Sequence, residues 1–193
     1  MNAQITYALI THPSAAMRKI RTTGALGSGI VMLLAASIST ALAYSVLSAE
    51  AIGPLPAWKL AVFALFGTAT VFALWLFMGG LTHSAACLMG GYGNFGRFLT
   101  AYGLTSAPFT LCAPAVVLLA PLGGTGASLF VLAVLPLIIV WAWVLNVIGI
   151  REIYGLSVGG ATVASLLPCL LIIALGLLLP ITMLASVVLR LGI

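Results

Sequence analysis

The sequence contains no aspartate and only two glutamates, Glu50 and Glu152, against seven lysines and arginines. Charged residues make up 5% of the chain and hydrophobic residues 63%, and the mean hydropathy is +1.31. A soluble domain needs a polar surface, and in soluble proteins roughly a quarter of all residues are charged. The scarcity of charge therefore excludes a soluble globular protein and predicts that lipid surrounds most of the chain.

Residues that support acid–base or metal chemistry are equally scarce. Two glutamates in different predicted loops cannot converge as a catalytic pair. The chain has only two histidines, His12 and His83, and its three cysteines have no metal-type spacing. We therefore expect no catalytic residue, no metal and no cofactor, so the protein is not expected to be an enzyme. Nucleic acid is not an expected partner.

Long uncharged stretches divide the chain into membrane spans, since one crossing needs about 20 apolar residues. The stretch from Phe98 to Ile150 is long enough for two, and Pro121-Leu-Gly-Gly-Thr-Gly126 in its middle predicts a turn. The predicted fold class is all-α, a polytopic bundle of five transmembrane helices with kinked segments. The spans are expected at roughly 25–48, 59–88, 98–121, 127–150 and 160–188.

The basic residues near the ends of these spans predict the orientation. One side carries five of them: Arg18, Lys19, Arg21, Arg97 and Arg151. The other side carries Lys59 and Arg190. Because Lys and Arg are in excess in cytoplasmic loops, the N-terminus is expected in the cytoplasm and the C-terminus outside.

Residues 1–24 are expected to form a cytoplasmic segment with a short, basic, amphipathic interfacial helix, and residues 25–193 the transmembrane domain. Met17 and Ile20 alternate with the bases, so their side chains would lie in the headgroup boundary while the bases meet anionic lipid. In a plainer interpretation the basic segment is only a topology signal. In another, the first apolar run and Ala41-Leu42-Ala43 form a signal peptide that is cleaved before Tyr44.

Glycines and prolines punctuate the predicted helices. Small-residue contacts are expected where Gly24, Gly27 and Gly29 open the first span, at Gly79 and Gly80 in the second, and at Gly155 and Gly159 near the fifth. Proline within a helix removes a backbone donor and kinks the helix, which is tolerated when a neighbour satisfies the freed carbonyl. Five prolines lie inside predicted helices: Pro108, Pro114, Pro136, Pro168 and Pro180.

Two residues form a candidate intramembrane polar site, His83 in the second span and Asn146 in the fourth. An ionisable group in a span is a functional candidate, although a neutral imidazole can also simply hydrogen-bond to a neighbouring helix. No acid lies within a span to relay protons, which argues against proton-coupled transport.

The segment Gly91-x-Gly93-x-x-Gly96 has the glycine pattern of a dinucleotide-binding turn. That turn works only after a β-strand and before a helix, with an acidic residue about 20 positions later. A long apolar helix is predicted before Gly91, and the later segment near Leu111 is apolar. The pattern therefore does not indicate a nucleotide site.

These residues instead resemble the Yip (Ypt-interacting protein) family. Met89-Gly90-Gly91-Tyr92-Gly93-Asn94-Phe95, then Tyr102-Gly103 and Pro108, looks like the family's glycine-rich pattern followed by tyrosine and proline. Trp141, then Gly149-Ile150-Arg151-Glu152-Ile153-Tyr154-Gly155-Leu156-Ser157 and Pro168, is similar to its fourth helix, Gly-Leu-Ser turn and proline-bearing fifth helix.

The resemblance covers nearly the whole chain and implies five spans with a cytoplasmic N-terminus. In eukaryotic members it implies small GTPase partners and a role in vesicle traffic. Their long soluble N-terminal region and acidic Asp-Leu-Tyr-Gly segment have no counterpart here, so a small GTPase partner is not carried over. The chain resembles the compact bacterial form, which implies the bacterial inner membrane.

Both motifs lie on the predicted cytoplasmic face, where their glycines let the backbone turn sharply and the two loops are expected to pack together. We expect contacts with partners or lipid at Gly90, Gly91, Gly93, Phe95, Arg97, Tyr102, Pro108, Arg151, Gly155 and Ser157. Arg97 and Arg151 are expected to contact anionic lipid headgroups, with snorkelling arginines on tight turns as the plainer interpretation.

Two functions are compatible with these features. The first is non-enzymatic membrane organisation or scaffolding through the cytoplasmic loops, with the lipid bilayer, other membrane proteins or a second copy of the chain as partners. The alternative is a small transporter, channel or lipid-handling protein with a path through kinked helices.

Overall fold

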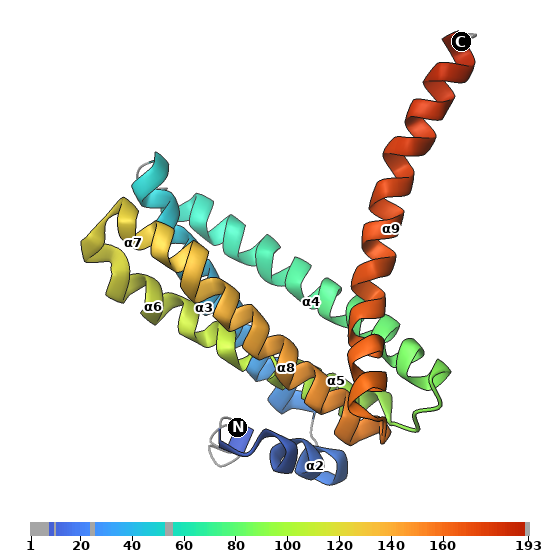
Figure 1. The fold of residues 1–193 in the computed structure, drawn as a ribbon. Helices are drawn as coiled ribbons and strands as arrows, with labels where there is room; N and C mark the ends of the chain where they lie inside the picture. The colour runs from blue at the N-terminus through green and yellow to red at the C-terminus, as the bar shows by residue number, and fades with distance from the viewer. Residues whose placement is uncertain (1–7, 10, 24–25, 53–55, 192–193) are drawn as a thin grey trace.

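The computed structural model describes residues 8–9, 11–23, 26–52 and 56–191, and the regular elements within them are all helices (Figure 1). In chain order these elements are α2 (Pro13–Thr23), α3 (Leu26–Ile52), α4 (Ala57–Leu88), α5 (Phe95–Leu104), η1 (Ala107–Leu111), α6 (Cys112–Leu119), η2 (Ala120–Leu122), α7 (Gly124–Leu129), η3 (Phe130–Val134), α8 (Leu135–Tyr154) and α9 (Val158–Leu191). The elements η1 and η2 are 3-10 helices, and η3 is a π-helical turn.

Four helical segments are long and apolar enough to cross a membrane: Leu26–Ser48, Leu65–Leu88, Phe95–Leu122 and Gly124–Tyr154. Within the described residues a fifth apolar segment, Val158–Ala174, is shorter. The predicted all-α, multi-pass architecture is therefore confirmed, whereas of the five predicted transmembrane helices four have the length and hydropathy to cross a membrane and the fifth is described only as a shorter apolar segment. Gly24 and the predicted start of the first span at residue 25 lie outside the described residues.

Helices α3, α4 and α8 run side by side with the α5–α6 segment, and α2 lies across one end of this bundle (Figure 1). Helix α9 begins at that end, packs against α4 and α8, and then diverges from the other helices. Helix α8 terminates beside α2, and α4 terminates at the same end of the molecule (Figure 1). The chain thus brings its N-terminal helix and two interhelical turns together at one end of the molecule.

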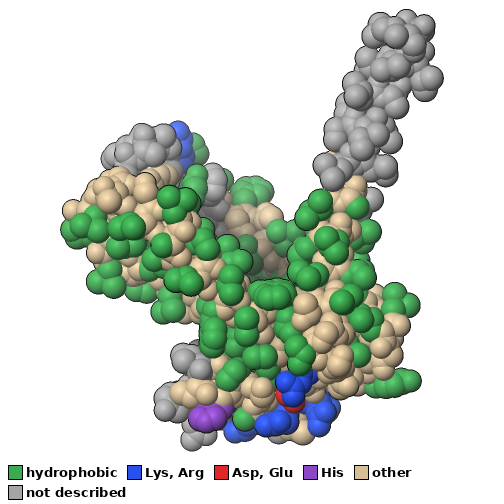
Figure 2. Space-filling model, viewed as in Figure 1, with side chains coloured by type: hydrophobic (Ala, Val, Ile, Leu, Met, Phe, Trp, Pro, Cys, Tyr) green, Lys and Arg blue, Asp and Glu red, His purple; other side chains and the backbone are tan. Residues whose placement is uncertain are grey.

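The basic residues divide between the ends as the sequence indicates. Basic side chains gather at the end that carries α2 (Figure 2), and we call it the basic end; its residues are Arg18, Lys19, Arg21, Arg97 and Arg151. Lys59 lies near the opposite end of α4, roughly 40 Å away at about 1.5 Å per residue. The side chain of Arg190 lies outside the described residues.

Helix α2 is part of the protein core. Met17 and Ile20 are 0% and 2% exposed, and they belong to a cluster with Phe98 of α5 and Ile150 of α8. The expectation that these two side chains lie in the lipid headgroups was therefore wrong. The contacts with α5 and α8 compete with lipid for the same apolar face, and they fix α2 to the bundle.

Among the predicted glycine contacts, the closest one joins α3 to α5. A Cβ built on Gly103 would lie 2.6 Å from the carbonyl oxygen of Gly29, and one on Gly29 would lie 2.7 Å from the carbonyl oxygen of Thr100. A Cβ on Gly27, Gly80 or Gly159 would meet no atom within 4 Å, so the predicted close packing was wrong there. Small residues are needed only where two backbones touch.

Proline breaks the third span in the way that the sequence predicts. Helix α5 ends before Pro108, η1 follows, and α6 contains Pro114, which cannot donate to the carbonyl of Thr110. The hydroxyl of Ser39 on α3 donates to that carbonyl at 2.8 Å and accepts from the amide of Ala113 at 2.9 Å. A neighbouring helix thus satisfies two backbone groups at the irregular turn. The side chain of Pro180 lies outside the described residues.

Replacing Ser39 with alanine is expected to lower the free energy of unfolding by about 1–2 kcal/mol, because two backbone groups then lose their partner in an apolar surrounding. Thermal unfolding in detergent micelles measures the change. The matched control is Ser37→Ala on the same helix, because the Ser37 hydroxyl bonds only to Leu33 of its own helix. Equal melting temperatures for the two variants would show that Ser39 does not support the turn.

Candidate functional site

The glycine motif forms the turn between α4 and α5. Gly90 has a φ of 85°, the left-handed conformation that glycine adopts readily. The amide of Gly91 donates to the carbonyl of Ala86 at 2.9 Å and that of Gly90 to Cys87 at 3.0 Å, so the helix ends in a Schellman motif. Asn94 then begins α5, because its side-chain oxygen accepts from the amide of Arg97 at 3.1 Å.

The second motif forms the turn between α8 and α9, also with a glycine that ends one helix and a polar side chain that caps the next. Gly155 has a φ of 70°, and its amide donates to the carbonyl of Arg151 at 3.0 Å, which ends α8. The hydroxyl of Ser157 accepts from the amide of Gly160 at 3.1 Å and caps the start of α9. Gly155 is therefore a helix terminator, and its predicted role in helix packing was wrong.

The two turns touch each other, as the sequence predicts. The amide of Tyr92 donates to the carbonyl of Tyr154 at 3.2 Å. A Cβ on Gly93 would lie 2.5 Å from the Tyr154 ring, which is itself only 3% exposed. We call α2 together with residues 89–97 and 151–157 the cap. The backbone hydrogen bond from Tyr92 to Tyr154 fixes the position of one turn relative to the other. The turns can approach this closely because Gly93 has no side chain.

Tyr154 also links the cap to α4. Its hydroxyl lies 2.6 Å from Nδ1 of His83, the contact to a neighbouring helix that the sequence analysis offered as a structural role for His83. The His83 ring lies 5.0 Å from that of Phe95, and the Tyr154 ring 5.4 Å from that of Phe98, between ring centroids. His83 therefore packs from α4 against the aromatic residues of the cap.

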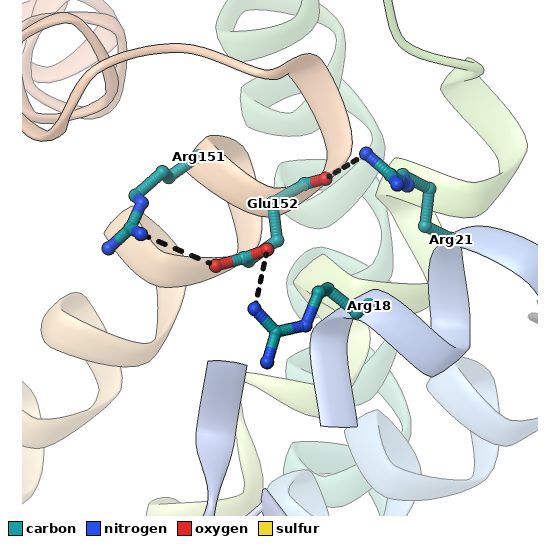
Figure 3. A network of polar contacts seen from close by, with 4 residues as sticks. All are labelled: Arg18, Arg21, Arg151 and Glu152. Carbon is teal, nitrogen blue, oxygen red and sulfur yellow. Dashed lines mark hydrogen bonds and ion pairs between the residues drawn. The ribbon is translucent and has the colours of Figure 1, made fainter. Parts of the chain in front are cut away.

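Glu152 lies at the centre of the basic end and is 9% exposed (Figure 3). Its carboxylate is 3.9 Å from Nη1 of Arg18 and 3.8 Å from Nη2 of Arg151. Its backbone carbonyl accepts from Nη1 of Arg21 at 3.3 Å. A buried carboxylate needs such partners, and the sequence analysis missed this role. The available signal was that this glutamate is the one acid on the basic side.

A pocket of about 290 Å³ opens on the cap beside this cluster. Its lining comes from all three cap segments: Arg21, Thr22, Tyr92, Gly93, Asn94, Arg97, Ile153, Tyr154 and Gly155. The structure thus pairs the predicted contact residue Arg97 with Arg21 across one pocket. Arg151 does not line it.

The second predicted polar residue, Asn146, lies in a different place from His83. Its side-chain amide donates to the hydroxyl of Ser165 at 3.0 Å and joins α8 to α9. Both residues line a cavity of about 330 Å³ between α3, α4, α5, α8 and α9. Trp75 also lines it, and its buried indole nitrogen has no hydrogen-bond partner among the described residues. His83 and Asn146 therefore do not form one site.

The remaining predicted contact residues fall into the interior or its edge. Tyr102 lines this cavity and its ring stacks on that of Phe98 at 5.5 Å. Pro108 is buried in η1, whereas Phe95 is 38% exposed at the start of α5. Among the described residues no group of three or more His, Cys, Asp or Glu side chains comes together as a metal site would require.

Comparison with known proteins gives one family match. Searches of curated proteins and of solved structures find no match. A family model described as the Yip1 domain matches residues 7–179, which include α2, both cap turns and the first part of α9. With its apolar helices this makes the chain an integral, multi-pass membrane protein, and it belongs to the Yip1 domain family.

Proposed function

We propose that this protein is a non-enzymatic membrane organiser that holds partner proteins at its cap, with the basic end in the cytoplasm. The Yip1 family is associated with membrane traffic and is generally non-enzymatic, which supports a binding role. The excess of arginine and lysine at the cap supports the cytoplasmic placement, and the resemblance to the compact bacterial form supports a bacterial inner membrane.

One observation carries the proposal: a tightly built turn presents large exposed side chains. Tyr92 in the turn is 93% exposed, and Leu88, the last residue of α4 beside it, is 88% exposed. Gly91 and Gly93 of the same turn lie close against Tyr154, which leaves no room for a side chain at either position. Aromatic residues and arginine are enriched in protein interfaces, and a rigid surface loses little conformational entropy on binding. The cap therefore has the composition and the rigidity of a binding surface.

Photocrosslinking from position 92 in living cells tests the proposal. We expect adducts with discrete proteins, a second copy of this chain among the possible partners, and we expect Tyr92→Ala to abolish co-purification of the same proteins. The matched control is Trp58→Ala, which removes another exposed aromatic side chain near the opposite end of α4. Adducts with lipid alone, or equal loss in both variants, would contradict a partner-binding cap.

A second function, lipid handling or transport, is favoured by the cavity that Asn146 and Ser165 line. Its lining is mainly apolar with a few hydroxyl and amide groups, as in sites for small lipophilic molecules. Reconstituted vesicles distinguish the two functions. If a lipid probe or solute moves faster than in empty vesicles, and Asn146→Leu slows that movement, the result would support lipid handling or transport. Unchanged permeability would support membrane organisation instead.

A further inference from the structure

We propose that the cap pocket binds a phosphate group, carried either by an anionic lipid headgroup or by free phosphate. The inference rests on the proposed function, because it names the chemistry that a cap at the membrane surface recognises. It also changes the pair of arginines that the sequence suggested. The binding pair is Arg21 and Arg97, and Arg151 has a different role.

The four arginines of the cap divide into two pairs. Arg18 and Arg151 lie within 4 Å of the Glu152 carboxylate, which offsets part of their charge (Figure 3). Arg21 and Arg97 have no carboxylate partner among the described residues, and both line the pocket. The other acid of the chain, Glu50, is on α3 near the end remote from the cap. The pocket therefore carries two arginines whose charges no carboxylate of the described residues offsets by direct contact.

The backbone holds Arg21 in place without using up its donors. One N–H of its guanidinium goes to the carbonyl of Glu152, and a guanidinium has five. The remaining N–H groups form a fork that matches two phosphate oxygens. Because the anchor is a carbonyl, Arg21 is positioned while its full charge is kept.

Helix α5 adds a second source of positive potential. Its first residue is Phe95, and Asn94 and Arg97 from its first turn line the pocket. Helix N-termini favour anions by their dipole and free amides. Here two arginines from separate helices line one opening of about 290 Å³, and the first turn of the ten-residue helix α5 lies beside it, so the helix dipole adds to their positive potential. That volume is near the lower end of the roughly 300–1,000 Å³ usual for small-molecule sites, which fits a headgroup better than a whole lipid.

The position suits a headgroup. Arg97 is the third residue of the apolar segment Phe95–Leu122, so its charge lies where that segment meets the interface. The neighbouring Tyr92 is almost fully exposed, and tyrosines are enriched at this depth of a membrane. A phosphate at the membrane surface can therefore reach the pocket without leaving the headgroup layer.

Native mass spectrometry of the full chain in maltoside micelles tests the inference with three probes: phosphatidylglycerol, diacylglycerol and inorganic phosphate. The two variants are Arg97→Gln and Arg151→Gln, each of which removes one exposed charge from the cap. General attraction to anions falls alike in both. We expect Arg97→Gln to bind phosphatidylglycerol about tenfold more weakly than Arg151→Gln, as the loss of a charge-assisted contact implies. Thermal unfolding checks that both variants remain folded.

Saturable binding of phosphatidylglycerol but not of inorganic phosphate would identify a lipid headgroup as the source, and saturation by inorganic phosphate would identify free phosphate. Either result, if lost in Arg97→Gln, supports the pocket. Equal affinities in the two variants, or equal binding of diacylglycerol, which lacks phosphate, would overturn it. Equal affinities in the two variants, together with crosslinking of proteins from position 92 that persists in Arg97→Gln, would mean that the pocket inference fails and the partner-binding cap stands.

Discussion

Replacement of Gly103 with alanine is expected to lower the free energy of unfolding by about 3 kcal/mol. The new Cβ would lie 2.6 Å from the carbonyl oxygen of Gly29 and 2.7 Å from its carbonyl carbon. Both are backbone atoms, so no side-chain rotation can relieve the overlap. Helices α3 and α5 would have to separate, so the third span would lose its packing contact with the first.

Thermal or denaturant-induced unfolding in micelles measures this loss, and a matched substitution isolates its cause. Gly27→Ala adds the same methyl group to α3 only two residues from Gly29, where no atom lies within 4 Å. That variant is expected to be as stable as the parent or more stable by up to about 1 kcal/mol, since alanine favours a helix over glycine. A Gly103→Ala protein that unfolds like Gly27→Ala would show that the two backbones are not in contact.

These two glycines also show where sequence analysis stops. The glycines at the start of the first span correctly predicted a close helix contact, because small residues in a membrane span generally serve packing. Periodicity gave no means of choosing between Gly27 and Gly29. The choice depends on which side of α3 meets α5, and in the structure that side carries Gly29.

The cap was predicted in outline, and its electrostatics were not. The two glycine turns and their mutual contact followed from the motifs. The burial of Glu152 did not, because a glutamate beside Arg151 in a loop would ordinarily be solvated. It is buried because α2 packs its apolar face on α8 and α5 instead of on lipid. That packing brings Arg18 and Arg21 to the end of α8.

The same packing explains why the predicted pair of arginines was incomplete. The sequence pairs Arg97 with Arg151 because both lie in glycine-bearing loops predicted on the cytoplasmic face of the membrane. In the structure Arg151 lies beside the Glu152 carboxylate, while the backbone carbonyl of Glu152 brings Arg21 to the pocket. A contact between residues 131 positions apart depends on the docking of α2, which hydropathy alone does not specify.

The cap and the bundle are separable in their effects. The contacts between α3 and α5 hold the spans together, whereas the contact of Gly93 with Tyr154 sets the register of two turns at the surface. A change at Gly103 should therefore weaken every function together with the stability of the fold. A change at Gly93 should remove the functions of the cap and leave the spans assembled.

Gly93→Ala is accordingly the second substitution with a large expected effect. Its Cβ would lie 2.5 Å and 2.6 Å from two ring carbons of Tyr154, and that ring is enclosed by His83 and Phe98. Gly93 does not have a positive φ, so the backbone itself tolerates alanine and the added methyl group is the whole perturbation. We expect a loss of about 2 kcal/mol in the free energy of unfolding. We also expect loss of the bond from the Tyr92 amide to Tyr154, and phosphate retention weakened at least as much as in Arg97→Gln.

Gly159→Ala is the control, since its Cβ would meet no atom within 4 Å near the start of α9. Melting temperature, phosphate retention and crosslinking from position 92 are compared in the two variants. If Gly93→Ala lowers the melting temperature but leaves the protein folded, and abolishes phosphate retention and crosslinking from position 92, then the register of the turns creates the binding surface. If it melts like Gly159→Ala and keeps both activities, then the ring of Tyr154 can move aside, and binding at the basic end depends on its charges without depending on its shape.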